Sequence, residues 1–93
     1  VIVNPSHYAV ALKWARTAGG APVCVAKGVD EIALRIKEIA YEEGVAVFSD
    51  PPTARALFAH VRLDAQILPE HYAAVAVAIR YADALSRKAR SWR

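Results

Sequence analysis

The sequence predicts a small α/β sandwich in which a sheet of about four strands is surrounded by three to four helices. Two observations predict this fold class. Short apolar segments alternate with longer segments in which apolar residues recur every three to four positions, and residues 22–26 are apolar throughout. Of the 93 residues, 56% are hydrophobic, which suffices for one core in a chain too short for two. We therefore expect one domain over residues 1–93.

Three strands are predicted in the first third of the chain. Residues 1–3 form an apolar run typical of the interior of a buried strand. In residues 8–14 the bulky side chains alternate, which places four of them on one face of a second strand: Tyr8, Val10, Leu12 and Trp14. After a turn over 16–20, the run at 22–26 is typical of a strand buried on both faces.

A helix is predicted next, from about Val29 to Glu43, and Gly44 is its C-terminal stop. Its apolar residues recur at the spacing of a stripe that faces a core: Ile32, Ala33, Ile36, Ile39 and Ala40. Residues 45–48 are apolar and follow as a fourth strand.

Two more helices complete the predicted fold. Asp50 caps a short helix that ends near His60, and Pro51 suits its first position. The last and longest helix begins after Pro69 and runs to about Lys88. Because apolar residues occupy much of its circumference, this helix is either buried between layers or leaves an apolar surface for a partner.

The charge pattern has two explanations. The formal net charge is +3, and five cations gather near the end of the chain: Arg80, Arg87, Lys88, Arg90 and Arg93. Cations in the last turns of a helix complement its dipole, which is the simpler explanation. Binding to nucleic acid or anionic lipid is the other, although no aromatic RNA-binding signature accompanies the cations.

We expect no cofactor and no metal site. Cys24 is the only cysteine, so it forms no internal disulfide, suits a reducing cytoplasm and is predicted to be an inert core residue. No ligand spacing links it to His7, and His60 and His71 are predicted to be surface or helix-end residues.

The pair Asn4–Pro5 has specific chemistry. The N–H that follows an asparagine commonly attacks the asparagine side chain, but Pro5 has no N–H. The remaining cyclisation runs the other way: the side-chain nitrogen of Asn4 attacks its own main-chain carbonyl, forms a succinimide and expels Pro5. Completion within minutes to an hour needs a barrier of about 21–23 kcal/mol, so the fold must hold the nitrogen near the carbonyl and stabilise the developing charge.

Two neighbours can assist this reaction. Histidine as a residue type can accept or donate a proton at physiological pH, so His7 can serve either role, and the hydroxyl of Ser6 can hydrogen-bond to the turn. An ordinary turn with a surface histidine explains the same four residues. The dipeptide alone therefore leaves both interpretations open.

Residues 4–13 resemble the Asn-Pro-Thr-His signature and following strand of the FlhB/YscU family, the export-switch components of flagellar and virulence type III secretion systems. The likeness continues over nearly the whole chain, at 21–28, 33–40, 50–58 and 68–70. Ser6 replaces the threonine of the family, which keeps the hydroxyl and loses the methyl group that stiffens the side chain. Thr53 stands where the family usually has an aliphatic residue.

This resemblance implies autocleavage by cyclisation of Asn4, a single event within the chain rather than multiple-turnover catalysis. Asn4 would be the cyclising residue, Pro5 the leaving group, and Ser6 and His7 the supporting residues. A change of exported substrate would follow, from rod and hook subunits to filament-type subunits. The implied partners are export-gate proteins, a hook-length control protein and exported flagellar subunits, and not nucleic acid.

The resemblance also implies that residues 1–93 are the cytoplasmic C-terminal domain of a bacterial inner-membrane protein. The strand-like start at Val1 agrees with a fragment whose upstream membrane region is absent. Residues 8–12 and 26–28 look flagellar rather than virulence-type. A virulence export switch and a basic adaptor domain that binds nucleic acid are the alternatives.

A docking surface is a further expectation. The apolar excess of the last helix and the apolar turn before the third strand predict a shallow site for exported subunits or partners, at Ala21, Pro22, Ala76 and Ile79.

Overall fold

A computed structural model describes residues 1–5, 7–14 and 19–90 and confirms the predicted α/β fold class. In chain order its elements are β1 (Ile2–Asn4), β2 (Tyr8–Lys13), β3 (Val23–Val29), α1 (Asp30–Glu42), β4 (Phe48–Ser49), α2 (Pro51–His60), the 3-10 turn η2 (Pro69–His71) and α3 (Tyr72–Arg90). The turn predicted over 16–20 lies largely outside the described residues, as do Ser6 and Arg93. No helix in the described part of the chain combines the length and the apolar character that a membrane span requires.

The four strands form one sheet in the order β3-β2-β1-β4. The pairs β1–β2 and β2–β3 are antiparallel, and β1–β4 is parallel. Strand β1 therefore lies inside the sheet with hydrogen-bonded neighbours on both sides. Its last residue, Asn4, pairs with Tyr8, the first residue of β2.

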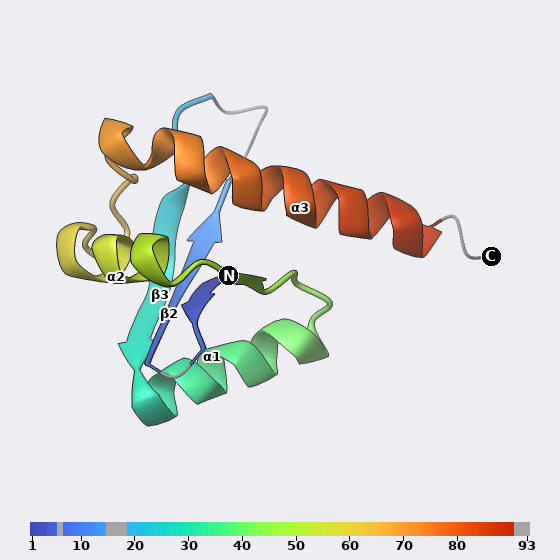
Figure 1. Cartoon of the computed structure of the whole chain (residues 1–93), viewed down its shortest axis with the longest axis horizontal. Coiled ribbons are helices and arrows are strands. Elements are labelled where there is room, and N and C mark those ends of the chain that lie inside the picture. Colours follow the sequence, from blue (N-terminus) through green and yellow to red (C-terminus); the bar gives the residue numbers. More distant parts are fainter. Residues whose placement is uncertain (6, 15–18, 91–93) are drawn as a thin grey trace.

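Helices cover both faces of the sheet, with α1 on one face and α2 and α3 on the other (Figure 1). Alternation along β1 divides the core accordingly: Ile2 packs with the α2 and α3 side, and Val3 packs with Ala33 of α1. The predicted alternation in β2 is confirmed, because Val10 lies in the α2–α3 core and Tyr8 and Leu12 pack against it. The second half of α3 runs out beyond the sheet (Figure 1).

Two strand predictions need correction. Strand β3 is not buried on both faces: it is an edge strand, and Val25 is 47% exposed. Cys24 in the same strand is fully buried, as predicted. The fourth strand covers only Phe48–Ser49 instead of 45–48, because β4 has a single neighbour, the three-residue β1.

The predicted apolar stripe of α1 is only partly directed into the core. Ala33 and Ala40 are buried, whereas Ile32 is 60% and Ile39 is 43% exposed. The small alanine side chains allow the helix to approach the sheet closely. The side of the helix that faces the sheet therefore carries Ala33 and Ala40, and the two isoleucines lie beside that contact, exposed to solvent. Gly44 ends the helix with φ of +70°, a conformation that glycine adopts without strain.

The caps of the later helices follow the sequence more closely. Asp50 caps α2 as predicted, accepting hydrogen bonds from the Thr53 backbone N–H at 3.3 Å and from its hydroxyl at 2.6 Å. His71 is not a surface residue: it is 5% exposed, and its Nδ1 accepts a hydrogen bond from the Leu68 N–H at 3.2 Å. Helix α3 buries one side, at Val75 and Ala78, and is not enclosed between layers, since no element of the described part of the chain covers its other side.

Candidate functional site

The turn between β1 and β2 holds the predicted reactive residues. Asn4 is half-buried at the end of β1, and Pro5 and His7 are exposed. Ser6 lies outside the described residues, so the structure places three of the four predicted residues. The antiparallel pairing of Asn4 with Tyr8 fixes where the turn begins and ends.

A backbone hydrogen bond spans the peptide bond that is predicted to react. The N–H of His7 donates to the carbonyl oxygen of Asn4 at 2.9 Å. This carbonyl is the one that the Asn4 side chain would attack. A donor that already points at its oxygen polarises the carbonyl and can stabilise negative charge as it develops there.

The start of α1 anchors the other end of the turn. The N–H of Asp30 donates to the carbonyl oxygen of His7 at 3.0 Å. Asp30 adopts a positive φ of 47°, which aspartate tolerates better than most residues. Gly28 permits the close packing at this junction, because a Cβ there would lie 2.1 Å from Cγ2 of Ile32. A backbone hydrogen bond thus joins the helix start to the last residue of the turn.

A third contact comes from a residue that the sequence analysis did not single out. The Nζ atom of Lys37 donates to the carbonyl oxygen of Pro5 at 3.1 Å, across 32 positions in the chain. No sequence pattern marks a lysine on a helix surface for such a contact, because the contact depends only on how the helix packs beside the turn. The carbonyls of Asn4, Pro5 and His7 are consequently all hydrogen-bonded.

The imidazole of His7 is free to act on the turn. Its ring centroid lies 6.2 Å from that of Tyr8, and it has no hydrogen bond to another described residue. An exposed imidazole at the end of the turn can exchange protons with water. This arrangement suits a proton carrier better than a rigid structural contact.

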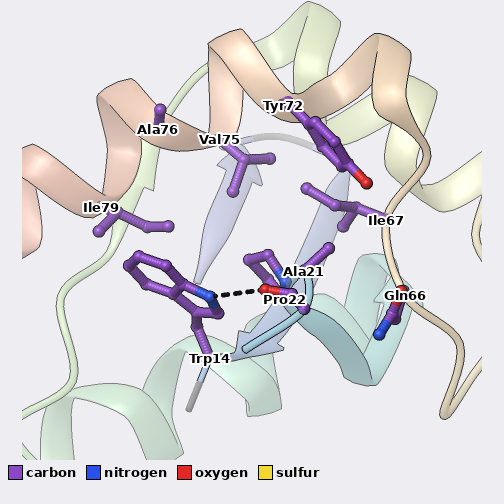
Figure 2. A pocket seen from close by; sticks show the side chains of 10 residues that line it. Trp14, Ala21, Pro22, Gln66, Ile67, Tyr72, Val75, Ala76 and Ile79 are labelled. Atoms are coloured by element: carbon purple, nitrogen blue, oxygen red, sulfur yellow. Dashed lines mark hydrogen bonds between the residues drawn. The ribbon is translucent and has the colours of Figure 1, made fainter. Parts of the chain in front are cut away.

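The predicted docking residues line a single pocket of about 310 Å³ between α3 and the start of β3 (Figure 2). Ala76 and Ile79 come from α3, while Ala21 and Pro22 lie opposite them. Figure 2 also shows Trp14 at one side of the pocket, where its indole Nε1 donates to the carbonyl oxygen of Gly20 at 3.2 Å. The remaining wall is formed by Gly20, Gln66, Ile67, Tyr72 and Val75.

The pocket and the turn lie at opposite ends of β2. Tyr8 begins the strand beside the turn, and Trp14 follows its end at the pocket. At about 3.3 Å per residue these ends are roughly 20 Å apart. The two candidate sites therefore share no side chain, and a change in one reaches the other only through the sheet or the surface.

Other predicted features do not add to either site. His60 is exposed at the end of α2, and His71 serves as a local cap. Burial raises the pKa of the Cys24 thiol above its ordinary value, which opposes formation of a reactive thiolate.

Comparison with known proteins relates the chain to one family. The model of the family described as the FlhB HrpN YscU SpaS family matches residues 1–82. The chain is 44% identical over 87 residues to the flagellar biosynthetic protein FlhB of Salmonella typhimurium, an alignment that covers 94% of this chain and 23% of that protein. The hypersensitivity response secretion protein HrcU of Ralstonia nicotianae is 47% identical over 58 residues, covering 62% of this chain and 16% of that protein. The chain thus spans about a quarter of the length of the FlhB relative.

Solved structures share the fold. The cytoplasmic domain of FlhB from Shewanella putrefaciens is 44% identical with a TM-score of 0.80, and the match covers 86% of this chain and 66% of that one. A mutated EscU C-terminal domain is 28% identical with a TM-score of 0.83, covering 87% and 81%. Other EscU domains in this group carry substitutions at an asparagine, at the proline directly after it, or at a histidine three positions after the asparagine. Asn4, Pro5 and His7 have the same spacing.

Proposed function

The chain belongs to the FlhB HrpN YscU SpaS family, and on that premise we propose that it acts in type III protein export and cuts its own backbone between Asn4 and Pro5. One observation carries this proposal: the Asn4 carbonyl accepts the His7 N–H at 2.9 Å in a turn that is anchored on both sides. The same bond between residues i and i+3 closes many ordinary β-turns, so the proposal rests on it together with the residue types Asn4, Pro5 and His7 at their positions in the turn.

The atoms that gain or lose a bond in the cleavage step all belong to this chain. A bond forms between Nδ2 of Asn4 and the Asn4 carbonyl carbon, and the C–N bond to Pro5 breaks. One proton passes from Nδ2 to the Pro5 nitrogen, with His7 as its carrier. The products are a C-terminal succinimide at Asn4 and a new amino terminus at Pro5, and a water molecule later opens the succinimide.

The cut segment stays with the domain. Ile2 and Val3 are buried, and β1 is paired with strands on both sides. Two further backbone hydrogen bonds hold it, from the Phe48 N–H to Val1 O at 2.8 Å and from the Asp50 N–H to Val3 O at 3.0 Å. Cleavage therefore frees the turn without dismantling the sheet.

The freed turn supplies a switch. Before the cut, the turn and the start of α1 present one fixed surface; after it, Pro5 and the following residues can leave that surface. Recognition of this change by export-gate proteins and by a hook-length control protein would shift export from rod and hook subunits to filament-type subunits. The flagellar assignment is favoured because FlhB relatives cover 77–94% of this chain, whereas HrcU covers 62%. A virulence-type export system is the second candidate.

The apolar pocket supplies a place for exported subunits. Its wall is almost entirely aliphatic and aromatic, with Gln66 as the one side-chain amide among the lining residues. Such a site suits apolar side chains of an extended segment. We place the parent protein in the bacterial inner membrane, with this domain on its cytoplasmic side.

Intact-mass measurement tests the central step. Under denaturing conditions the wild-type chain should yield two masses, a product that begins at Pro5 and the segment 1–4, and the Asn4→Ala variant should keep one uncut mass. A wild-type chain that stays whole for days at neutral pH refutes autocleavage.

A further inference from the structure

We infer that Lys37 is a positioning residue for cleavage at Asn4, an inference that rests on the proposed function above. Its Nζ atom lies 3.1 Å from the Pro5 carbonyl oxygen, the first carbonyl after the bond that breaks. Lys37 touches neither the nucleophile nor the leaving nitrogen in the structure. It acts through the peptide plane that follows Pro5.

The geometry of α1 explains why this lysine reaches the turn. Asp30 opens the helix and binds His7 O, and Lys37 follows seven positions later on the same side of the helix. Side chains of a helix tilt toward its N-terminus, so the four-carbon stem of Lys37 runs back toward the turn. The Lys37 side chain is half-buried as a whole, and its hydrogen bond to the Pro5 oxygen is exposed to solvent.

The torsions of proline explain what the contact controls. The ring of Pro5 fixes φ, which leaves ψ as its one soft backbone torsion. Rotation about ψ moves the Pro5 carbonyl and also the chain that leads to the His7 N–H. Among the described residues, Lys37 is the only hydrogen-bond donor to that carbonyl. By holding the Pro5 oxygen, Lys37 keeps the His7 N–H directed at Asn4 O.

The charge of Lys37 adds to this positioning. Nucleophilic attack places negative charge on the Asn4 oxygen, one peptide unit away from the Pro5 oxygen that the ammonium contacts. A cation held by a hydrogen bond beside developing negative charge favours the transition state over the resting turn, and because this contact is exposed, solvent reduces the effect. A charged donor is therefore expected at this position, rather than any residue of similar length.

The neighbouring cation on the same helix provides a matched control. Arg35 is exposed, and its guanidinium lies 4.0 Å from the carboxylates of Glu38 and Glu42. No hydrogen bond or ion pair joins it to Asn4, Pro5 or His7, the residues of the turn that the structure describes. Removing its charge changes the net charge of the domain as much as removing that of Lys37, and leaves the Pro5 carbonyl with its donor.

The test measures cleavage rates after refolding. Chains with a tag before Val1 are purified uncut in denaturant and diluted into native buffer, and the product starting at Pro5 is followed by intact mass. Loss of one hydrogen bond to a charged donor should slow cleavage of Lys37→Met roughly three- to tenfold. Lys37→Arg should retain most of the wild-type rate because it keeps a charged donor, and Arg35→Met should match wild type.

Folding effects are separated in an Asn4→Ala background, where no cut interferes. The melting temperatures of the Met and Arg variants should agree there, so a rate difference between them reports the donor and not stability. Lys37→Met cleaving at the wild-type rate, or Lys37→Arg cleaving as slowly as Lys37→Met, overturns the positioning role. A wild-type chain that fails to cleave overturns the proposed function itself. This outcome is distinct from the two that overturn only the role of Lys37.

Discussion

The backbone N–H of His7 lies 2.9 Å from the carbonyl oxygen of Asn4, so the bond proposed to break belongs to a carbonyl that already accepts a hydrogen bond. This relationship gives His7 two separable roles. Its backbone polarises the carbonyl whatever side chain it carries, and its imidazole is available to move the proton. Replacing the imidazole therefore tests only the second role.

Substituting His7 should slow cleavage without abolishing it. General acid–base assistance is worth about 10²–10⁴-fold in rate, whereas the backbone donor survives in His7→Ala. We expect slow cleavage of His7→Ala in the refolding assay, accelerated by added imidazole. Complete loss in a folded variant, with no response to imidazole, would indicate that the side chain positions the turn and does not carry the proton.

Replacing Pro5 should change which reaction occurs. In Pro5→Ala the new N–H can attack the Asn4 side chain, and φ of residue 5 is no longer fixed. We expect cleavage to fall roughly tenfold or more and deamidation of Asn4 to appear. Peptide mapping distinguishes the two products, and Asn4→Ala should give neither. A variant that cuts at the wild-type rate with no deamidation contradicts the leaving-group argument.

The conformation of Asp30 predicts opposite effects for two substitutions. Its φ of 47° suits glycine and opposes β-branched residues. Asp30→Gly should change the free energy of unfolding by no more than about 1 kcal/mol, whereas Asp30→Val should lower it by about 1–3 kcal/mol. Because the Asp30 N–H anchors His7 O, Asp30→Val should also slow cleavage. Equal urea midpoints for the two variants would show that residue 30 does not keep its positive φ in solution.

Local sequence patterns were enough to predict much of this structure. The alternation of Tyr8, Val10 and Leu12 and the cap at Asp50 depend on near neighbours, and both are confirmed. The docking residues come from segments more than fifty positions apart, yet they line one pocket. Their role as a docking site stays a prediction.

The parts that sequence could not predict depend on packing at a distance. Isoleucine and alanine satisfy a helical period equally well, so the pattern of α1 could not show that Ala33 would be buried and Ile32 exposed. The contact between Lys37 and Pro5 spans 32 positions and requires the β3–α1 junction to be in place first. His71 was expected at the surface or at a helix end: it ends η2, but its burial was not predicted, because a histidine that caps its own turn has no distinct spacing.

Core packing predicts a large difference between two leucines. Leu57 is fully buried between α2 and the sheet, whereas Leu63 is 55% exposed. In an Asn4→Ala background, Leu57→Ala should lower the free energy of unfolding by about 2–5 kcal/mol, and Leu63→Ala should stay within about 0.5 kcal/mol. Urea denaturation measures both. Similar losses for the two variants would place Leu57 outside the core.

The buried thiol predicts a dependence of stability on alkaline pH. Burial raises the folded-state pKa of Cys24 above the ordinary value of 9.0. Below pH 9 both states keep the proton, and as pH rises further the unfolded thiol ionises first, so stability falls by up to about 1.4 kcal/mol per pH unit. The difference in unfolding free energy between wild type and Cys24→Ala should shrink above pH 9. A difference that stays constant to pH 10.5 would contradict burial of the thiol.

The pocket yields a prediction that is independent of cleavage. Ala76 lines it from α3, and Ala73 on the same helix is exposed and does not line it. A carboxylate at position 76 would place a charge beside the apolar wall and disfavour an apolar ligand, even where it pairs with Arg80 four positions later, whereas one at 73 is exposed to water. In the full-length protein, Ala76→Asp should reduce export of flagellar subunits while its turn is still cut, and Ala73→Asp should export normally. Undiminished export from a folded Ala76→Asp variant would show that subunits dock elsewhere. Lost cleavage in that variant would mean that the pocket and the turn, some 20 Å apart along β2, are coupled through the sheet.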